Sequence, residues 1–171
     1  MIDFKLPTVE MGAYGMVLVS DLWSPTGRCE VGEYDDDEWD DELGTEVAIV
    51  YVDNGMVLVP HEWLLALPDS FIPSVPISHA FGGDWLYAVQ PDPINAPHLV
   101  KVGRSRNVPT RLRQYRTANP YASVVGVRPF ADGVDETAIL GIAARMLHRV
   151  SGEVFEGDVL AFVGKAFPVA A

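Results

Sequence analysis

The segment that most restricts the fold is a tight turn at residues 53–55, which separates two runs rich in β-branched residues. VAIVYV precedes Asp53-Asn54-Gly55, and MVLVP follows it. Asn-Gly tolerates the positive φ that a tight hairpin turn requires. The sequence therefore predicts an antiparallel β-hairpin within the first seventy residues.

The sequence around this hairpin also predicts short strands and tight turns. Strands are expected at 15–19 and 46–52, with a turn at Pro25, Thr26 and Gly27, and HEWLLAL after the hairpin is expected to form a short helical turn. By pattern alone this succession is similar to an SH3-like barrel. We expect residues 1–68 to form a small β-barrel-like module.

An acidic stretch, GEYDDDEWDDELGTE at residues 32–46, interrupts this module. Repulsion between adjacent carboxylates disfavours compact structure, so the stretch is predicted to be an exposed loop. It is either a solvated loop, a phosphate mimic that covers the protein's own basic groove, or a surface that recruits a basic protein partner.

Charge divides the chain into an acidic first part and a second part with a basic run. Residues 1–80 carry sixteen acids against two bases, whereas residues 81–171 carry eight acids against ten bases. Six of those bases lie within residues 101–116, and no acid occurs between Asp92 and Asp132. This local positive field favours a polyanion such as nucleic acid, although the whole chain has a net charge of -12.

Length and composition restrict the class of protein. The 171 residues allow one domain or two small ones, and the hydrophobic share of 49% is enough for a core. The single cysteine, Cys29, fits a reducing compartment. No segment reaches about 18 apolar residues and the start is unlike a signal peptide, so we expect a cytoplasmic protein that does not enter a membrane.

Residues 69–84 are expected to form a linker, because the segment 68–84 contains three prolines and two adjacent glycines. The region after it, residues 85–171, predicts a second module in the order β-β-α-β-α-α. Strands are expected at 85–90, 98–103 and 121–130, and helices at 108–117, 134–149 and 158–166. Asn107 is expected to cap the first of these helices and Asp132 the second.

The second module resembles the GIY-YIG nuclease superfamily, in particular a phage-related branch of it. Trp85-Leu86-Tyr87 stands where the family has GIY, and Lys101-Val102-Gly103 stands where it has YIG. Arg111 matches the catalytic arginine, Tyr115 matches the His or Tyr one helical turn later, and Glu136 matches the metal-binding glutamate. The resemblance covers residues 84–167 and implies an α+β fold with endonuclease activity on DNA.

A further part of the resemblance lies near the C-terminus, where Gly152-Glu153-Val154-Phe155 is similar to the GEWF signature of the branch. Glu153 is either a second carboxylate near the site or an exposed acid in a turn, and we favour the exposed acid.

The residue types also suit phosphodiester hydrolysis. Arg111 has a bidentate guanidinium matched to phosphate oxygens, and Tyr115 at i+4 shares its helix edge. If the register of the first two strands agrees, Tyr87 and Lys101 are neighbours. Lys101 would then lower the pKa of Tyr87, which the resemblance makes the general base.

Glu136 is the candidate metal ligand, because it falls within the apolar arc of its predicted helix. The resemblance implies Mg²⁺ or Mn²⁺ there; the alternative is an ordinary acid in the first turn. Arg111 and Glu136 are expected to converge from separate helices on a common hollow.

Three functions remain open at this stage. The first is a metal-dependent endonuclease acting on DNA, and the second is a catalytically inactive GIY-YIG-fold protein that binds nucleic acid. The third is an acidic adaptor that binds a basic protein partner. In the first two, four arginines are expected to contact the nucleic-acid backbone: Arg104, Arg106, Arg113 and Arg116.

Overall fold

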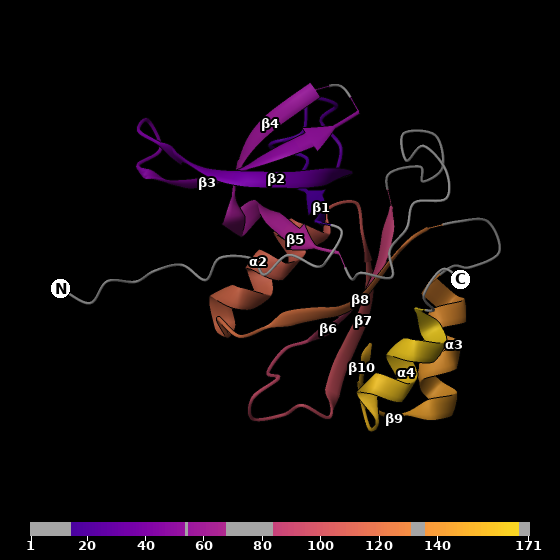
Figure 1. Ribbon diagram of the computed structural model, residues 1–171. Helices are drawn as coiled ribbons and strands as arrows, with labels where there is room; N and C mark the ends of the chain where they lie inside the picture. The colour runs from indigo at the N-terminus through magenta and orange to yellow at the C-terminus, as the bar shows by residue number, and fades with distance from the viewer. Residues whose placement is uncertain (1–14, 54, 68–83, 131–135, 168–171) are drawn as a thin grey trace.

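The computed structural model describes residues 15–53, 55–67, 84–130 and 136–167 (Figure 1). These residues form a mixed α+β fold with two antiparallel sheets, one built from residues 16–66 and the other from residues 85–156. The expected linker lies outside the described residues except for Asp84. Within the ranges given above, no helix is long and apolar enough to cross a lipid bilayer.

The N-terminal sheet has the strand order β4-β3-β2-β1-β5. The expected hairpin is confirmed, because β3 and β4 pair antiparallel and Val52 lies opposite Gly55. The expected turn before β2 is confirmed as well, since Gly27 has φ +66° and donates to the carbonyl of Ser24. The strands are β1 (Met16–Val19), β2 (Glu30–Asp40), β3 (Thr45–Val52), β4 (Gly55–Pro60) and β5 (Leu64–Ala66).

The acidic stretch is largely a strand, so the prediction of a loop over 32–46 was wrong. It forms most of β2, and residues Glu33–Asp40 pair with β3. Successive side chains in a strand point to opposite faces, which separates neighbouring carboxylates and leaves most of them in water. One of them, Asp37, instead receives a hydrogen bond of 2.8 Å from the buried ring of His61.

The segment HEWLLAL also differs from expectation. Only His61–Trp63 form a helical turn, η1, and Leu64–Ala66 form β5 beside β1. In β5, Leu64 and Leu65 are buried in two different cores, which a helical turn would not allow. The described strands form an open sheet rather than a closed barrel, since β4 and β5 are its two edges.

The C-terminal sheet has the strand order β8-β6-β7-β10-β9. Its strands are β6 (Trp85–Gln90), β7 (Leu99–Ser105), β8 (Ser123–Pro129), β9 (His148–Ser151) and β10 (Val154–Glu156). The helices of this part are α2 (Val108–Ala118), α3 (Glu136–Met146) and α4 (Val159–Ala166). The order is therefore β-β-α-β-α-β-β-α, and the predicted order lacked the hairpin β9-β10.

The helix predicted over 134–149 ends earlier than expected, at Met146. Residues 148–156 instead turn back as a hairpin, and Gly152 has φ +52° at its tip. Phe155 is fully buried in this arrangement, and β10 pairs with β7. The expected cap Asp132 lies outside the described residues.

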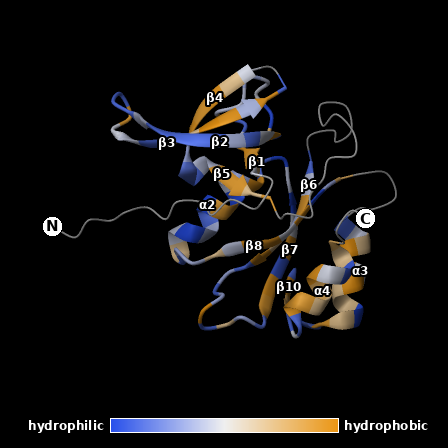
Figure 2. Ribbon diagram, viewed as in Figure 1, coloured by the Kyte–Doolittle hydropathy of each residue, from blue (hydrophilic) through white to orange (hydrophobic). Residues whose placement is uncertain are grey.

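Helices cover the two faces of the C-terminal sheet unequally. One face, which includes Leu86, Ala88 and Val102, packs against α3 and α4. The other, which includes Trp85, Tyr87 and Val89, packs against α2. Figure 1 shows α2 on one side of this sheet and the pair α3 and α4 on the other, and Figure 2 shows hydrophobic residues along these strands and through α3 and α4.

The core on the α2 side also joins the two sheets. Leu18, Val31 and Leu65 of the N-terminal sheet are buried in one cluster with Trp85 and Tyr87. Helix α2 closes this cluster with its own buried side chains, Val108 and Leu112. The two sheets therefore share a core and do not pack as separate units.

Asn107 joins the start of α2 to the N-terminal sheet. Its side-chain oxygen accepts from the amide of Thr110 at 3.2 Å, so the expected N-cap is confirmed. Its side-chain nitrogen donates to Asp21 at 2.6 Å and to Ser20 at 3.0 Å. One side chain thus serves both the helix terminus and the contact between the two parts.

We expect Asn107→Ala to lower the free energy of unfolding by about 2 kcal/mol, because it removes the cap and the bonds to the N-terminal sheet. Asn107→Ser should lose less, since serine keeps a capping oxygen but is too short to reach Asp21. Urea unfolding of both variants measures the difference. Equal stability of the two variants would show that the cap contributes nothing.

Candidate functional site

The centre of the candidate site is the ring of Tyr87, which lies across β7. In the register of β6 and β7, Tyr87 stands opposite Gly103 and Val89 stands opposite Lys101. A Cβ at Gly103 would lie 2.6 Å from the Tyr87 hydroxyl, so only glycine leaves room for this ring. Lys101 shares the sheet face of Tyr87, but one diagonal step away and not directly opposite.

Helix α2 adds two side chains to the same face. Tyr115 packs against the core that contains Tyr87, close enough to raise the pKa of Tyr87. The Lys101 ammonium lies 5.6 Å from the centre of the Tyr115 ring. Arg111 is exposed, and its charge acts on Tyr87. We call Tyr87, Lys101, Arg111 and Tyr115 the tyrosine–arginine cluster.

The ionisation of Tyr87 differs from the sequence expectation. Burial raises the pKa of Tyr87 well above its ordinary value, and the hydrogen bond to Tyr115 raises it further, whereas Arg111 opposes both effects. The expectation of a lowered pKa at Tyr87 was wrong, because the effect of burial outweighs that of nearby positive charge. Tyr87 is therefore a neutral hydroxyl at neutral pH.

Glu153, which the sequence offered as a possible second carboxylate near the site, lies in the turn between β9 and β10, beside β7. The charge of Glu153 also raises the pKa of Tyr87, after the effects of burial and of Tyr115. Its backbone carbonyl accepts from the amide of Val102 at 3.1 Å, which fixes the β9-β10 turn beside β7. Gly152 of the GEVF segment makes the turn that brings Glu153 to this strand.

Glu136 does not join the tyrosine–arginine cluster. It lies at the start of α3, and α3 packs on the sheet face opposite to α2 (Figure 1). The expected convergence of Arg111 and Glu136 on one hollow is therefore wrong. A helix periodicity identifies which side of a helix faces inward, but it does not identify which face of the sheet that helix covers.

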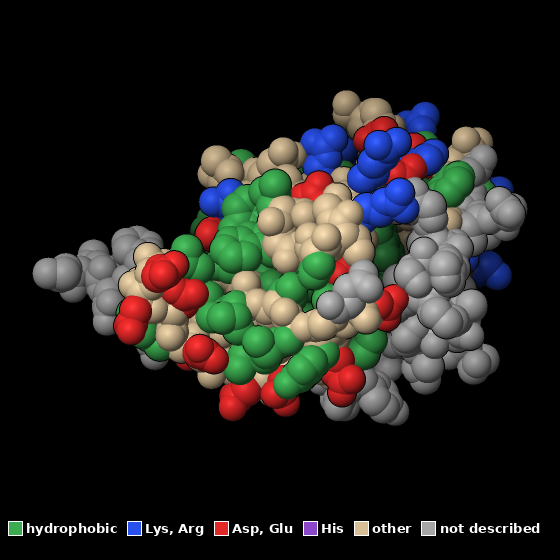
Figure 3. Space-filling view, turned by 90° about the horizontal axis from the view of Figure 1, so that it is seen from above, with side chains coloured by type: hydrophobic (Ala, Val, Ile, Leu, Met, Phe, Trp, Pro, Cys, Tyr) green, Lys and Arg blue, Asp and Glu red, His purple; other side chains and the backbone are tan. Residues whose placement is uncertain are grey.

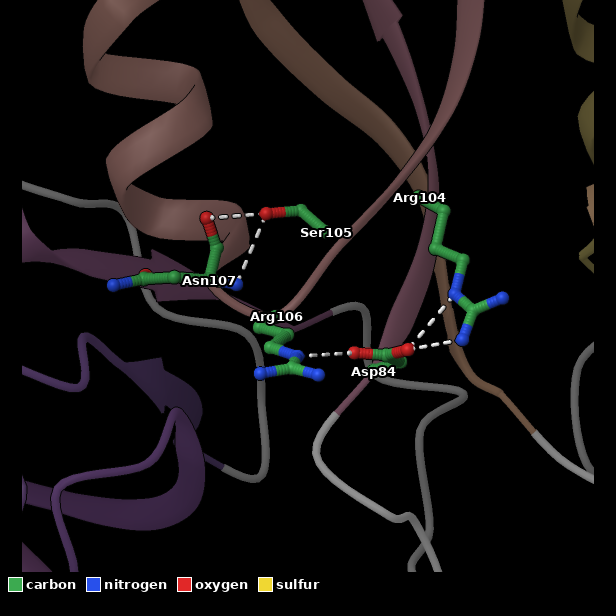
Figure 4. A network of polar contacts seen from close by, with 5 residues as sticks. All are labelled: Asp84, Arg104, Ser105, Arg106 and Asn107. Carbon is green, nitrogen blue, oxygen red and sulfur yellow. Dashed lines mark hydrogen bonds and ion pairs between the residues drawn. The ribbon is translucent and has the colours of Figure 1, made fainter.

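Two of the four arginines expected to contact nucleic acid are bound to Asp84 (Figure 4). Arg104 forms an ion pair with the Asp84 carboxylate and stacks on Phe130, with its guanidinium carbon 4.1 Å from the ring centre. Arg106 Nε lies 3.4 Å from the other Asp84 oxygen, and its side chain remains 88% exposed. The acid just before β6 thus neutralises part of the basic run.

The other two arginines are also engaged within the protein. Arg113 stacks on Trp63 at 4.2 Å and lies 3.3 Å from the carboxylate of Glu62, so it faces the N-terminal sheet. Arg116 is half-buried and donates to the carbonyl of Ala122. Arg111 differs from Arg104, Arg106 and Arg113, because its side chain donates to the neutral Gln114, at 2.9 Å, and not to a carboxylate.

A divalent cation at the tyrosine–arginine cluster would need carboxylate or imidazole ligands close to it. Glu136 does not fit as its ligand, since it lies on the opposite sheet face. Within the described part of the chain, no group of three or more His, Cys, Asp or Glu side chains is arranged to hold a metal. Glu153 is the carboxylate whose charge reaches the cluster.

Comparisons of this chain with protein-family models, curated proteins and solved structures find no match.

The raised pKa of Tyr87 predicts a loss of stability in alkali. The folded protein keeps this proton at pH values where the unfolded chain loses it, so stability falls as the pH rises above about 10. We expect this fall to be less steep in Tyr87→Phe, as measured by urea unfolding at a series of pH values. Tyr121→Phe, at an exposed tyrosine, is the control; equal slopes in wild type and Tyr87→Phe would contradict the assignment.

Proposed function

We propose that this protein binds the sugar-phosphate backbone of nucleic acid, DNA in the first instance, at the tyrosine–arginine cluster. The observation that carries the proposal is that Tyr87 and Tyr115 pack together with the Lys101 ammonium over the Tyr115 ring, while the charge of Arg111 acts on Tyr87. The resemblance to the GIY-YIG superfamily supports it as well.

The chemistry of these groups suits a phosphodiester. Arg111 offers a permanently charged fork that matches two phosphate oxygens, and Lys101 adds a second positive charge. The raised pKa of Tyr87 keeps its hydroxyl protonated, so this hydroxyl is a neutral donor for a ligand oxygen. The site therefore combines cations with a neutral donor, as anion recognition requires.

The distribution of charge restricts where nucleic acid would lie. The first eighty residues repel a polyanion, whereas residues 93–131 carry no acid at all. The backbone would run along the side of the C-terminal sheet that carries α2. Arg106 lies on the same basic run and its side chain is 88% exposed, although its ion pair with Asp84 offsets part of its charge.

A second candidate function, metal-dependent hydrolysis of the phosphodiester, is favoured by Glu153. A hard cation such as Mg²⁺ or Mn²⁺ binds through as few as one carboxylate together with substrate phosphate, and supplies a deprotonated water at neutral pH. Arg111 would offset the charge that builds on the phosphoryl oxygens. Tyr87 would donate a hydrogen bond and would not act as the ground-state base, because its pKa is raised.

The compartment that we propose is the cytoplasm. Cys29 is a free thiol buried in the shared core, which suits a reducing environment.

We expect Arg111→Ala to weaken binding of a short DNA by tenfold or more, because a charged hydrogen bond to phosphate is lost. Fluorescence anisotropy over a range of salt concentrations measures this, and the slope of log affinity against log salt should decrease by about one. Arg145→Ala, at an exposed arginine of α3 on the opposite sheet face, should change little. Equal losses from Arg111→Ala and Arg145→Ala would refute a site at the cluster.

The second candidate predicts nicking of a supercoiled plasmid in Mg²⁺ or Mn²⁺. Glu153→Gln should abolish the nicks, because it removes the carboxylate near Tyr87, while Glu136→Gln should cut at the wild-type rate. Nicking that depends on Glu136 and not on Glu153 would overturn this arrangement. DNA binding without nicking in either metal would exclude hydrolysis and would retain only the first function, binding of the nucleic-acid backbone.

A further inference from the structure

A second surface, on the N-terminal sheet, combines exposed apolar side chains with a border of acids. The register of β2, β3 and β4 places two rows across one sheet face. The first row is Glu33, Tyr51 and Met56, and the second is Asp36, Ile49 and Leu58. We call these six residues the acid-bordered face.

The apolar part of this face is unusually exposed. Tyr51 is 50% exposed and Met56 is 54% exposed, while Ile49 and Leu58 are half-buried beside them. Figure 3 shows hydrophobic side chains gathered over the N-terminal part of the molecule, with acidic side chains along their border. Adjacent exposed hydrophobic side chains with a polar rim are typical of protein interaction surfaces.

The same sheet face is already used for packing elsewhere in the molecule. Val31 stands two residues before Glu33 on β2, and Leu18 lies opposite Val31. Both are buried in the core that the two sheets share, together with Leu65 of β5. The face therefore runs from this core onto β3 and β4, where Val47 on the same face is buried and Tyr51 and Met56 are exposed.

The charge of the acid-bordered face indicates which kind of partner could bind there. Glu33 and Asp36 are exposed at its border, and residues 1–80 carry sixteen acids against two bases. These charges repel nucleic acid and anionic lipid, and they also oppose pairing of this face with a second copy of itself. They attract lysine and arginine.

We propose that the acid-bordered face docks a cationic segment of another protein. The segment would set apolar side chains against Tyr51 and Met56 and basic side chains against Glu33 and Asp36. This inference does not rest on the proposed function, because the tyrosine–arginine cluster lies on the other sheet.

The test uses the full chain and a short synthetic peptide of alternating lysine and leucine, titrated by isothermal calorimetry at physiological salt. Peptides of alternating glutamate and leucine, and of alternating lysine and serine, are the matched probes. We expect only the lysine–leucine peptide to bind. Failure of this peptide to bind, or equal binding of either matched probe, would overturn the proposal.

Variants assign any binding to this face. Tyr51→Ser/Met56→Ser should weaken binding by at least about tenfold, because the apolar contact is lost. Glu33→Gln/Asp36→Asn should weaken it and reduce its salt dependence. The control Val150→Ser/Leu160→Ser removes exposed apolar side chains from the C-terminal part and should have no effect. An equal loss in this control would overturn the assignment.

Sedimentation velocity tests whether a second copy of the chain binds the acid-bordered face instead. A monomer at the concentrations of the titration agrees with the proposal. A dimer that Tyr51→Ser/Met56→Ser dissociates would mean that a second copy covers this face, and would contradict it. Thermal unfolding of each variant checks that these surface changes leave the fold intact.

Discussion

The core between the two sheets is the constraint on which the rest of the structure depends. Trp85 and Tyr87 from β6 are buried there against Leu18 and Leu65 from the N-terminal sheet, and α2 closes the space between them. Because burial of large apolar side chains is the main favourable term in folding, this contact fixes where α2 lies. The position of α2 in turn fixes Arg111 and Tyr115 above Tyr87.

The position of Tyr87 between the two sheets and α2 makes it both a core residue and a member of the candidate site. The Tyr87 ring is part of the core, whereas its hydroxyl crosses Gly103 toward the edge of the sheet where Glu153 lies. Burial keeps the hydroxyl neutral, and the nearby cations of Arg111 and Lys101 supply the positive charge. One core residue thus connects the stability of the fold with the chemistry of the site.

Elements that are determined by a few adjacent residues could be predicted from the sequence. The hairpin at Asp53, strand β6 and the cap at Asn107 each depend on a few adjacent residues. Strand β5 and the hairpin β9-β10 could not be predicted in this way, because they form by pairing with strands that are distant in sequence. Strand β5 pairs with β1, and β10 pairs with β7. The local charge repulsion of the acidic residues in β2 predicts a loop. Pairing with the apolar strand β3 outweighs this repulsion, and that pairing is not a local signal.

The candidate site was predicted in part. The relative positions of Arg111 and Tyr115 follow from helix geometry. The shared sheet face of Tyr87 and Lys101 depends also on the register of β6 and β7, which the sequence leaves open. The placement of Glu136 could not be predicted, because it depends on which sheet face α3 covers. The partners of Arg104 and Arg113 could not be predicted either, since Asp84 and Glu62 are distant in sequence.

The most direct test of the central claim is a crystal structure of the protein with a short single-stranded DNA. The account predicts one phosphate within hydrogen-bond distance of the Arg111 guanidinium and of a hydroxyl of Tyr87 or Tyr115. A DNA backbone that lies on the α3 side of the sheet, with the tyrosine–arginine cluster uncontacted, would contradict it.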